Sequence, residues 1–142
     1  MRKEQLDNWI KNGGQLPENL EESEKDYLKS LGWHQERGWY DVDYGMKQLE
    51  WEVNYIDDAV HGNVPHGIYR EWYEHGQLEH ERSYLRGEVI QLRDWTRNGQ
   101  ILSDRRRLRG KRHGVHRIWT EDGELYRHEE YAYGVLLRDY LK

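Results

Sequence analysis

Apolar and polar residues alternate along most of this chain. From Trp39 the apolar residues recur at every second position, first over residues 40–44 and again over residues 49–55. A period of two is the pattern of a β-strand whose successive side chains point to opposite faces. The two runs predict a hairpin with its turn near Gly45. The chain from residue 38 to residue 142 is therefore expected to be a β domain.

The first 37 residues follow a helical period instead. Residues 5–11 predict a short helix and residues 17–31 predict a second one, and each is followed by a glycine that would end it. Both helices are amphipathic and too short to be stable alone in water, so we expect their apolar stripes to dock on the sheet. The predicted organisation is a helical cap over residues 1–37 followed by a β-hairpin repeat domain over residues 38–142.

Three blocks in the second half of the chain repeat with a period of 23 to 24 residues. A fixed period of this size indicates that each unit is a supersecondary element that must stack on its neighbours. The first hairpin is interpreted as a degenerate fourth copy. The repeated motifs are Arg70-Glu71-Trp72, Arg93-Asp94-Trp95 and Arg117-Ile118-Trp119, followed by the dipeptides His75-Gly76, Asn98-Gly99 and Asp122-Gly123.

These dipeptides predict two-residue hairpin turns of type I′, in which both central residues have positive φ. A second series of glycines with the same period marks the turns that link one hairpin to the next. Turn positions fix the register of the flanking strands. The expected cross-strand pairs are Trp72 with Glu79, Arg70 with Glu81, Arg93 with Asp104, Ile118 with Arg127, and Arg117 with His128; the linking glycines are Gly87, Gly110 and Gly134.

The expected fold is mainly β. It is an antiparallel β-hairpin repeat of about nine strands in a single twisted sheet, with short N-terminal helices at one end. Composition agrees, because apolar residues make up only 35% of the chain, charged residues make up another 35%, and the mean hydropathy is −1.22. The 7 Trp and 11 Tyr, with no Phe, suit half-exposed sheet surfaces and interfaces.

Composition also excludes several kinds of chemistry. The chain has no cysteine, which removes disulfides, thiolate zinc sites and cysteine nucleophiles. It has no apolar run of membrane-spanning length and no signal-peptide pattern, so we expect a cytoplasmic protein without a membrane span. No catalytic constellation or phosphate-binding loop is present, which indicates a protein that is not an enzyme and needs no cofactor.

The repeat unit resembles a known family. A glycine after a turn, an apolar residue two positions later, a Tyr six beyond that and a further Gly, with His66-Gly67 or His113-Gly114 opening a unit, are similar to the MORN-repeat variants. The similarity is strongest to bacterial YwqK-type antitoxins and covers about residues 40–140. Arg107 departs from the pattern, because Tyr84 and Tyr131 hold the equivalent position.

The resemblance implies a β-hairpin repeat fold and a non-enzymatic binding module. Proteins of this type are commonly antitoxins or immunity proteins, and MORN repeats more broadly are associated with protein scaffolding and lipid contact. The motif consists mainly of turn and core residues, so it bears on the fold more directly than on function. The resemblance leads us to expect an inhibitor that neutralises a partner protein by occlusion.

Charge is divided unevenly along the chain. Residues 1–66 hold 7 Lys and Arg against 14 Asp and Glu, whereas residues 67–142 hold 15 against 13. An acidic surface interleaved with aromatic side chains suits capture of a basic protein, such as a toxin or effector, although these positions also suit ordinary solvent-facing residues. The candidate partner-binding residues are Tyr40, Asp41, Asp43, Tyr44, Glu50, Glu52, Trp72, Trp95 and Trp119.

The Arg-x-Trp motifs admit two interpretations. Arg and Trp two residues apart share a face, and stacked hairpins would align them as a binding surface with cation-π contacts. Alternatively they form a structural ladder in which Glu81 and Asp104 pair with Arg70 and Arg93 across the strands. The sequence leaves both open.

A second candidate surface is the basic segment over residues 105–112. It could bind nucleic-acid phosphates or anionic lipid, as a structural adaptor would, but alternation divides its charge between two faces and the chain is acidic overall. Nucleic acid is therefore not the expected partner. The candidate anion-binding residues are Arg105, Arg106, Arg107, Arg109, Lys111 and Arg112.

Eight histidines raise the question of a metal site. His113 and His116 lie three residues apart in a predicted strand, so their side chains face opposite sides, and His128 is the only obvious addition. We therefore expect no metal site. The sequence does not specify an oligomeric state.

Overall fold

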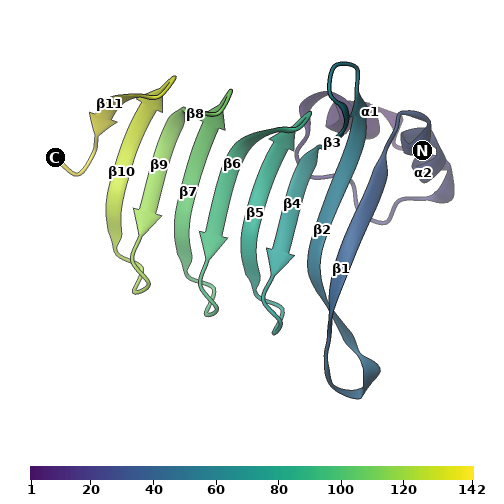
Figure 1. Cartoon of the computed structure of the whole chain (residues 1–142), viewed down its shortest axis with the longest axis horizontal. Helices are drawn as coiled ribbons and strands as arrows, with labels where there is room; N and C mark the ends of the chain where they lie inside the picture. The colour runs from purple at the N-terminus through teal and green to yellow at the C-terminus, as the bar shows by residue number, and fades with distance from the viewer.

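A computed structural model describes all 142 residues. The chain forms two short helices and one open antiparallel sheet (Figure 1). The helices are α1 (Lys3–Asn12) and α2 (Glu22–Ser30); the strands are β1 (His34–Asp41), β2 (Lys47–Asp58), β3 (Gly62–Pro65), β4 (Gly67–Trp72), β5 (Leu78–Leu85), β6 (Glu88–Trp95), β7 (Ile101–Leu108), β8 (Lys111–Arg112), β9 (Gly114–Trp119), β10 (Leu125–Ala132) and β11 (Val135–Asp139).

The sheet is a meander, as the sequence predicts. Its nine main strands follow the order β1-β2-β4-β5-β6-β7-β9-β10-β11, so almost every strand pairs with its neighbour in the chain. The two additional strands are short: β3 pairs with the end of β2, and β8 pairs with the end of β7. The mainly β fold with N-terminal helices is therefore confirmed, with eleven strands in place of about nine.

The helices differ from the prediction in length. The first is three residues longer than expected, but α2 begins at Glu22, although the sequence predicted a helix from residue 17. Asn19 has φ 53, which interrupts a helix, and the Glu21 and Glu24 side chains form a capping box at the true start. At the other end, β1 begins at His34, within the range that the sequence assigned to the cap.

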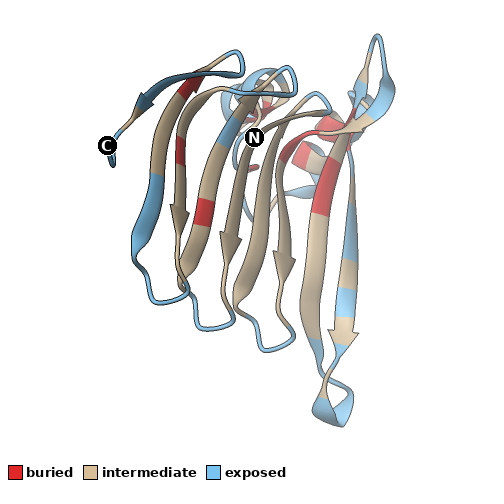
Figure 2. Ribbon diagram, turned by 60° about the vertical axis from the view of Figure 1, so that its left-hand side comes forward, coloured by how far each residue is buried: buried red, intermediate tan, exposed pale blue.

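The core lies between the cap and one end of the sheet. Only 14 of the 142 residues are buried, so the rest of the sheet is a single layer with half-buried side chains (Figure 2). Glu24, 1% exposed, anchors the cap from within: it binds the Arg2 guanidinium at 2.9 Å, and this hydrogen bonding lowers its pKa to about 2. The core residues are Leu6, Trp9, Leu16, Leu28, Trp33 and Ile56.

The turns inside the three repeat hairpins are not of the predicted type. In the turn at Gly76, the Gly76 N–H donates to the Tyr73 carbonyl and the Tyr73 N–H donates to the Gln77 carbonyl, while only Gly76 has positive φ. This is a three-residue loop with a glycine bulge, in which His75 has negative φ, so the type I′ prediction was wrong here. The same hydrogen bonds recur at Gly99 and Gly123.

Two consecutive residues with positive φ, the mark of a type I′ turn, occur instead at Tyr44-Gly45 in the first hairpin and where hairpins are linked. At Arg86-Gly87 the two φ values are 46 and 89. The linking turns contain no Asn or Asp, the residues that favour type I′ geometry. The sequence therefore predicted type I′ for the turns inside the hairpins. The remaining linking turns are Arg109-Gly110 and Tyr133-Gly134.

The predicted register is correct in the middle of each hairpin. The pairs Arg70 with Glu81, Arg93 with Asp104, Ile118 with Arg127, and Arg117 with His128 are all present. The pair nearest the turn was wrong, because Trp72 lies opposite Leu78 and not Glu79. A β-bulge next to the turn inserts one extra residue in β5, and equivalent bulges occur in the next two hairpins.

Alternation gives the sheet two faces. Arg70, Arg93 and Arg117 point to one side, which we call the ladder face, whereas Tyr69 and Tyr84 point to the other, which we call the groove face. The cap covers the ladder face only at the β1–β4 end, where α1 and α2 lie behind the sheet in Figure 1. The groove face has no cap.

His66 joins the cap to the repeats. It is 1% exposed; its Nδ1 accepts the Arg86 N–H at 2.9 Å, and its Nε2 lies 2.6 Å from the Trp9 carbonyl oxygen. Because Nδ1 is an acceptor, Nε2 carries the proton of a neutral ring. His113 holds the equivalent place, with Nδ1 accepting the Tyr133 N–H at 3.2 Å. The His-Gly dipeptides thus support the linking turns.

Stability is expected to fall as pH falls below 6.5. Burial lowers the pKa of both His66 and His116 from the ordinary value of 6.5, so the unfolded chain binds protons that the folded one excludes. Their contribution is therefore complete above pH 6.5 and is lost progressively below it. Carboxylates such as Glu24, with its pKa of about 2, stay ionised between pH 7.5 and pH 5. Urea denaturation at several pH values in this range measures the effect; a flat profile would contradict it.

Candidate functional site

The tip of the first hairpin projects beyond the other turns of the sheet (Figure 1). We call residues 39–48 the finger. Tyr44 at its end is 100% exposed and has φ 63, Met46 is 67% exposed and Trp39 is 49% exposed. Large apolar side chains at the end of a projection gain burial only when another molecule covers them.

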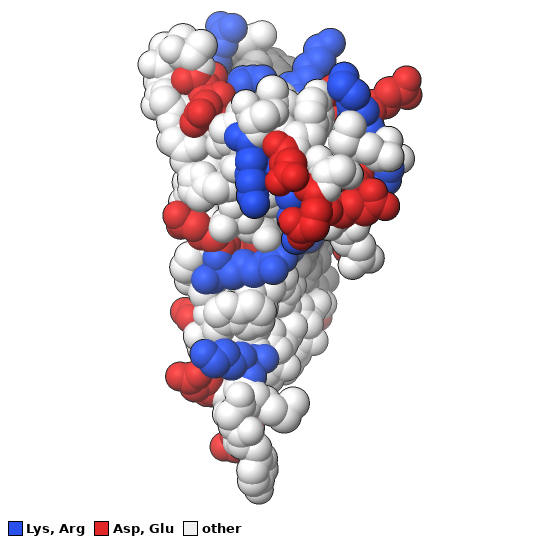
Figure 3. Space-filling model, turned by 90° about the vertical axis from the view of Figure 1, so that its right-hand side faces the viewer, with Lys and Arg blue, Asp and Glu red and all other residues white.

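Acidic groups flank the tip. Asp41 and Asp43 are exposed, and the one ion pair here, from Lys47 to Asp41 at 3.7 Å, joins two exposed groups and contributes little. Figure 3, which looks onto the β1 edge, shows the molecule narrowing to this tip, with acidic groups along its side and a largely uncharged end. The structure therefore keeps together four of the predicted residues: Tyr40, Asp41, Asp43 and Tyr44.

Tyr40, at the base of the finger, lies beside carboxylates from the next hairpin. Burial raises its pKa, and so do the charges of Glu50, Glu79, Glu71 and Glu74. We call these four glutamates the acidic patch. The sequence identified only Glu50, because the other three belong to the second hairpin and approach Tyr40 only when β4 pairs with β2.

Next to the acidic patch, the groove face carries an aromatic groove of about 450 Å³. Its aromatic rings come from β2, β4 and β5, and two carboxylates border it. None of the lining residues is among the nine candidate partner-binding residues from the sequence, because tyrosines such as Tyr84 look like repeat-consensus positions. The groove is lined by Glu36, Trp51, Val53, Tyr55, Pro65, Tyr69, Glu71 and Tyr84.

Glu52, by contrast, lies on the ladder face within a row of alternating charges. Its Oε2 is 2.7 Å from the Arg37 Nε, and Glu52 is the register partner of Arg70. The row continues from Glu81, which lies 3.0 Å from Arg70 and 3.3 Å from the Arg93 guanidinium. Across eight strands the positions are Arg37, Glu52, Arg70, Glu81, Arg93, Asp104, Arg117 and His128.

This row favours the structural alternative for the Arg-x-Trp motifs. Arg70 and Arg93 are engaged by Glu81 and Asp104, as the sequence proposed, whereas Arg117 has no carboxylate within 4.0 Å. Trp72, Trp95 and Trp119 stand beside the row and are half-buried. The cap loop over residues 15–20 faces the row across a cleft of about 510 Å³ that Arg70 and Trp72 help to line.

The basic segment is divided between faces, as predicted. Arg105 and Arg107 point to the groove face, where they meet Arg112 and Arg127 around a small cavity of about 80 Å³ beside His116. The Arg105 Nε is buried without a hydrogen-bond partner. The other members do not join this cluster: Arg106, Arg109 and Lys111 are exposed and line no part of the cavity.

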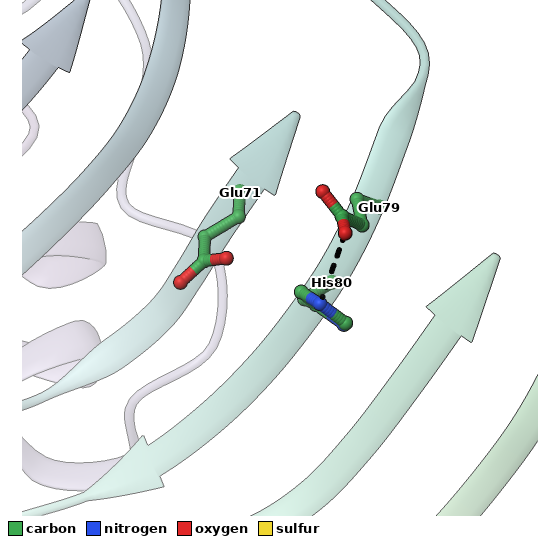
Figure 4. Close-up of side chains that lie close together, drawn as sticks. All are labelled: Glu71, Glu79 and His80. Atoms are coloured by element: carbon green, nitrogen blue, oxygen red, sulfur yellow. Dashed lines mark ion pairs between the residues drawn. The ribbon is translucent and has the colours of Figure 1, made fainter. Parts of the chain in front are cut away.

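The histidines that the sequence considered together lie apart. His116 is buried on the groove face against Tyr131, and His128 is on the ladder face, stacked on Tyr140. A different group brings together three side chains of types that can ligate a metal ion: Glu71, Glu79 and His80 on the groove face (Figure 4). The sequence missed it because its members are close only through strand pairing.

Neither helix is long and apolar enough to cross a membrane. Comparison of the chain with protein-family models, with curated proteins and with solved structures finds no match.

Proposed function

We propose that this protein binds another protein and neutralises it by occlusion, as an antitoxin or immunity protein does. The observation that carries the proposal is the finger, which presents Trp39, Tyr44 and Met46 to solvent at the end of a projecting hairpin. Exposed aromatic anchors beside charged groups are the composition of binding hot spots. The resemblance to YwqK-type antitoxins supports the same class of function.

The surroundings of the finger favour a basic partner. Asp41 and Asp43 lie on the finger, and the acidic patch and the aromatic groove lie at its base on the same uncapped face. Negative charge steers a basic protein to this surface, and the rings then supply buried contact area. The regular single-layer sheet holds this surface in place. The proposed mechanism is that the surface covers the active site of the target protein.

The test uses the finger and a matched control at the other end of the sheet. We expect Tyr44→Ala and Trp39→Ala each to weaken partner binding at least about tenfold, since anchor residues contribute about 2 kcal/mol or more. Tyr133→Ala is the control, because Tyr133 is also exposed, at 62%, and also has positive φ, at 49. Calorimetry measures binding to the protein that wild type retains stoichiometrically from native lysate.

Two results would count against this function. One is that wild type retains no stoichiometric protein partner. The other is that Tyr44→Ala and Trp39→Ala bind the partner as well as wild type and Tyr133→Ala do.

A second candidate function is binding of an anionic surface, as an adaptor would. The observation in its favour is the cluster of Arg105, Arg107, Arg112 and Arg127, in which Arg107 and Arg112 have no carboxylate within 4.0 Å. Unopposed guanidinium groups suit phosphate. Retention of nucleic acid or anionic vesicles that is lost in high salt and in Arg107→Gln would support this function in place of the first.

A further inference from the structure

Glu71, Glu79 and His80 come from two adjacent strands. Glu71 on β4 is the register partner of His80 on β5, and Glu79 precedes His80. One donor atom from each side chain lies within 4.8 Å of the other two, and all three residues are half-buried (Figure 4). Two carboxylates and an imidazole thus face a common space.

The β-bulge explains why Glu79 joins this group. In a regular strand Glu79 and His80 would point to opposite faces. The bulge opposite Trp72 makes Glu79 the extra residue of β5 and turns its side chain toward the groove face. The His80 Nε2 consequently lies 3.4 Å from the Glu79 Oε1.

A carboxylate outside the group orients the imidazole. The Nδ1 of His80 lies 2.5 Å from Asp94 Oδ1, and Asp94 is in turn held by the Arg82 guanidinium at 3.0 Å and the Ser103 hydroxyl at 2.6 Å. With its Nδ1 proton donated to Asp94, His80 directs the Nε2 lone pair toward the two glutamates. Metal-binding histidines are commonly fixed by a carboxylate in this way.

The other hairpins provide an internal comparison. They have the same bulge in the same place but carry different side chains there. The framework is therefore general to the repeat, whereas the set of three donors occurs in one unit. The positions of Glu71, Glu79 and His80 are occupied by Asp94, Leu102 and Ser103 in the next hairpin and by Ile118, Tyr126 and Arg127 in the last.

We propose that Glu71, Glu79 and His80 bind a divalent transition-metal ion of the Zn²⁺ class. Imidazole with carboxylate oxygen is a ligand set for such ions, whereas Mg²⁺ prefers oxygen ligands alone. Ligand bonds of about 2.0–2.2 Å allow donors at most about 4.4 Å apart. The three donor atoms already lie within 4.8 Å of one another, so binding requires at most a small movement. Rotation of half-exposed glutamates provides that movement, and three protein ligands leave a position open to water.

A proton on the His80 Nε2 is the alternative to a metal ion at this position. If His80 carries protons on both nitrogens, it forms ion pairs with Asp94 and Glu79 and no metal is required. Titration of the metal-free protein with Zn²⁺ distinguishes the two, because the proton-only arrangement predicts no saturable site.

The experiment is calorimetric titration of the full chain with Zn²⁺, and in parallel with Mg²⁺. We expect one saturable Zn²⁺ site and no Mg²⁺ site, with Zn²⁺ affinity lowered at least about tenfold in both Glu79→Gln and His80→Ala. The controls are Glu121→Gln, at the equivalent exposed position in the turn of the last hairpin, and His34→Ala, whose imidazole lies 3.5 Å from Glu36 without a third donor. Both controls should bind Zn²⁺ as wild type does.

The absorption spectrum of the Co²⁺ form gives a second readout, which should change in Glu79→Gln. Thermal melting establishes that each variant is folded, and Glu79→Gln alone decides the question if His80→Ala is not. The proposal is overturned if no Zn²⁺ site saturates below about 1 mM. It is also overturned if Glu79→Gln binds Zn²⁺ with wild-type affinity, or if the control substitutions reduce the affinity equally.

Discussion

Replacing Trp9 with alanine is expected to lower the free energy of unfolding by about 3–5 kcal/mol. Trp9 is 1% exposed and lies at the centre of the small core that holds the cap on the sheet. A β-carbon on Gly67 would lie 2.5 Å from the indole Nε1, so the ring fits directly against that backbone. The indole also donates to the Gly14 carbonyl at 3.1 Å and meets the His66 ring edge-on at 4.9 Å.

The loss of unfolding free energy is large because few other side chains are buried, so Trp9 supplies a large share of the core. Urea denaturation followed by circular dichroism measures it, with Trp39→Ala as the control. Trp39 is 49% exposed on the finger, so its substitution should change stability by no more than about 0.5 kcal/mol. If Trp9→Ala unfolds at the same urea concentration as Trp39→Ala, the cap does not contribute to the cooperative core as described.

Replacing His66 with phenylalanine is expected to destabilise the protein by about 2–4 kcal/mol. Phenylalanine preserves most of the ring volume but leaves the Arg86 N–H without its acceptor and removes one of the two donors to the Trp9 carbonyl, which keeps only the Gly13 N–H, in a site that is 1% exposed. Each buried group that loses its hydrogen bond costs about 1–3 kcal/mol. Denaturation in urea at pH 7.5 measures the effect.

The repeat supplies a graded control in His113→Phe. His113 is only half-buried and supports one N–H, that of Tyr133, so its loss should be about 1 kcal/mol. His66→Phe should also weaken the pH dependence of stability below pH 6.5, because phenylalanine has no group that binds a proton on unfolding. Equal losses in the two variants, or an unchanged pH profile in His66→Phe, would show that His66 is not the buried, neutral link described here.

Local signals in the sequence were sufficient for the repeat itself. Strict alternation and a constant period fixed the strands, and turn glycines at regular intervals fixed the pairs Arg70–Glu81 and Arg93–Asp104 within each hairpin. These contacts join residues 11 positions apart, so they follow from counting along one hairpin. The opposite charges of the two residues in each pair could be recognised from the sequence for the same reason.

Turn geometry was less predictable. Dipeptides such as Asn98-Gly99 favour type I′, but a bulge in each hairpin makes the loop one residue longer and leaves only the glycine with positive φ. The type I′ turns fell on Arg86, Arg109 and Tyr133, where the neighbouring strands and a supporting side chain outweigh the local preference. The supporting group at Arg109 is Glu88, which takes the histidine's place.

The sequence by itself determined the repeat, its strands, the register in the middle of the three repeat hairpins and a turn near Gly45, since each depends on neighbours in one hairpin. Only the tertiary structure decided what hairpin packing brings together: Trp9 against Gly67, Tyr40 among the acidic patch, and Glu71 beside Glu79 and His80. Their partners lie on different strands or on the cap. These contacts depend on β-bulges and on docking of the cap, and neither produces a periodic pattern in the sequence.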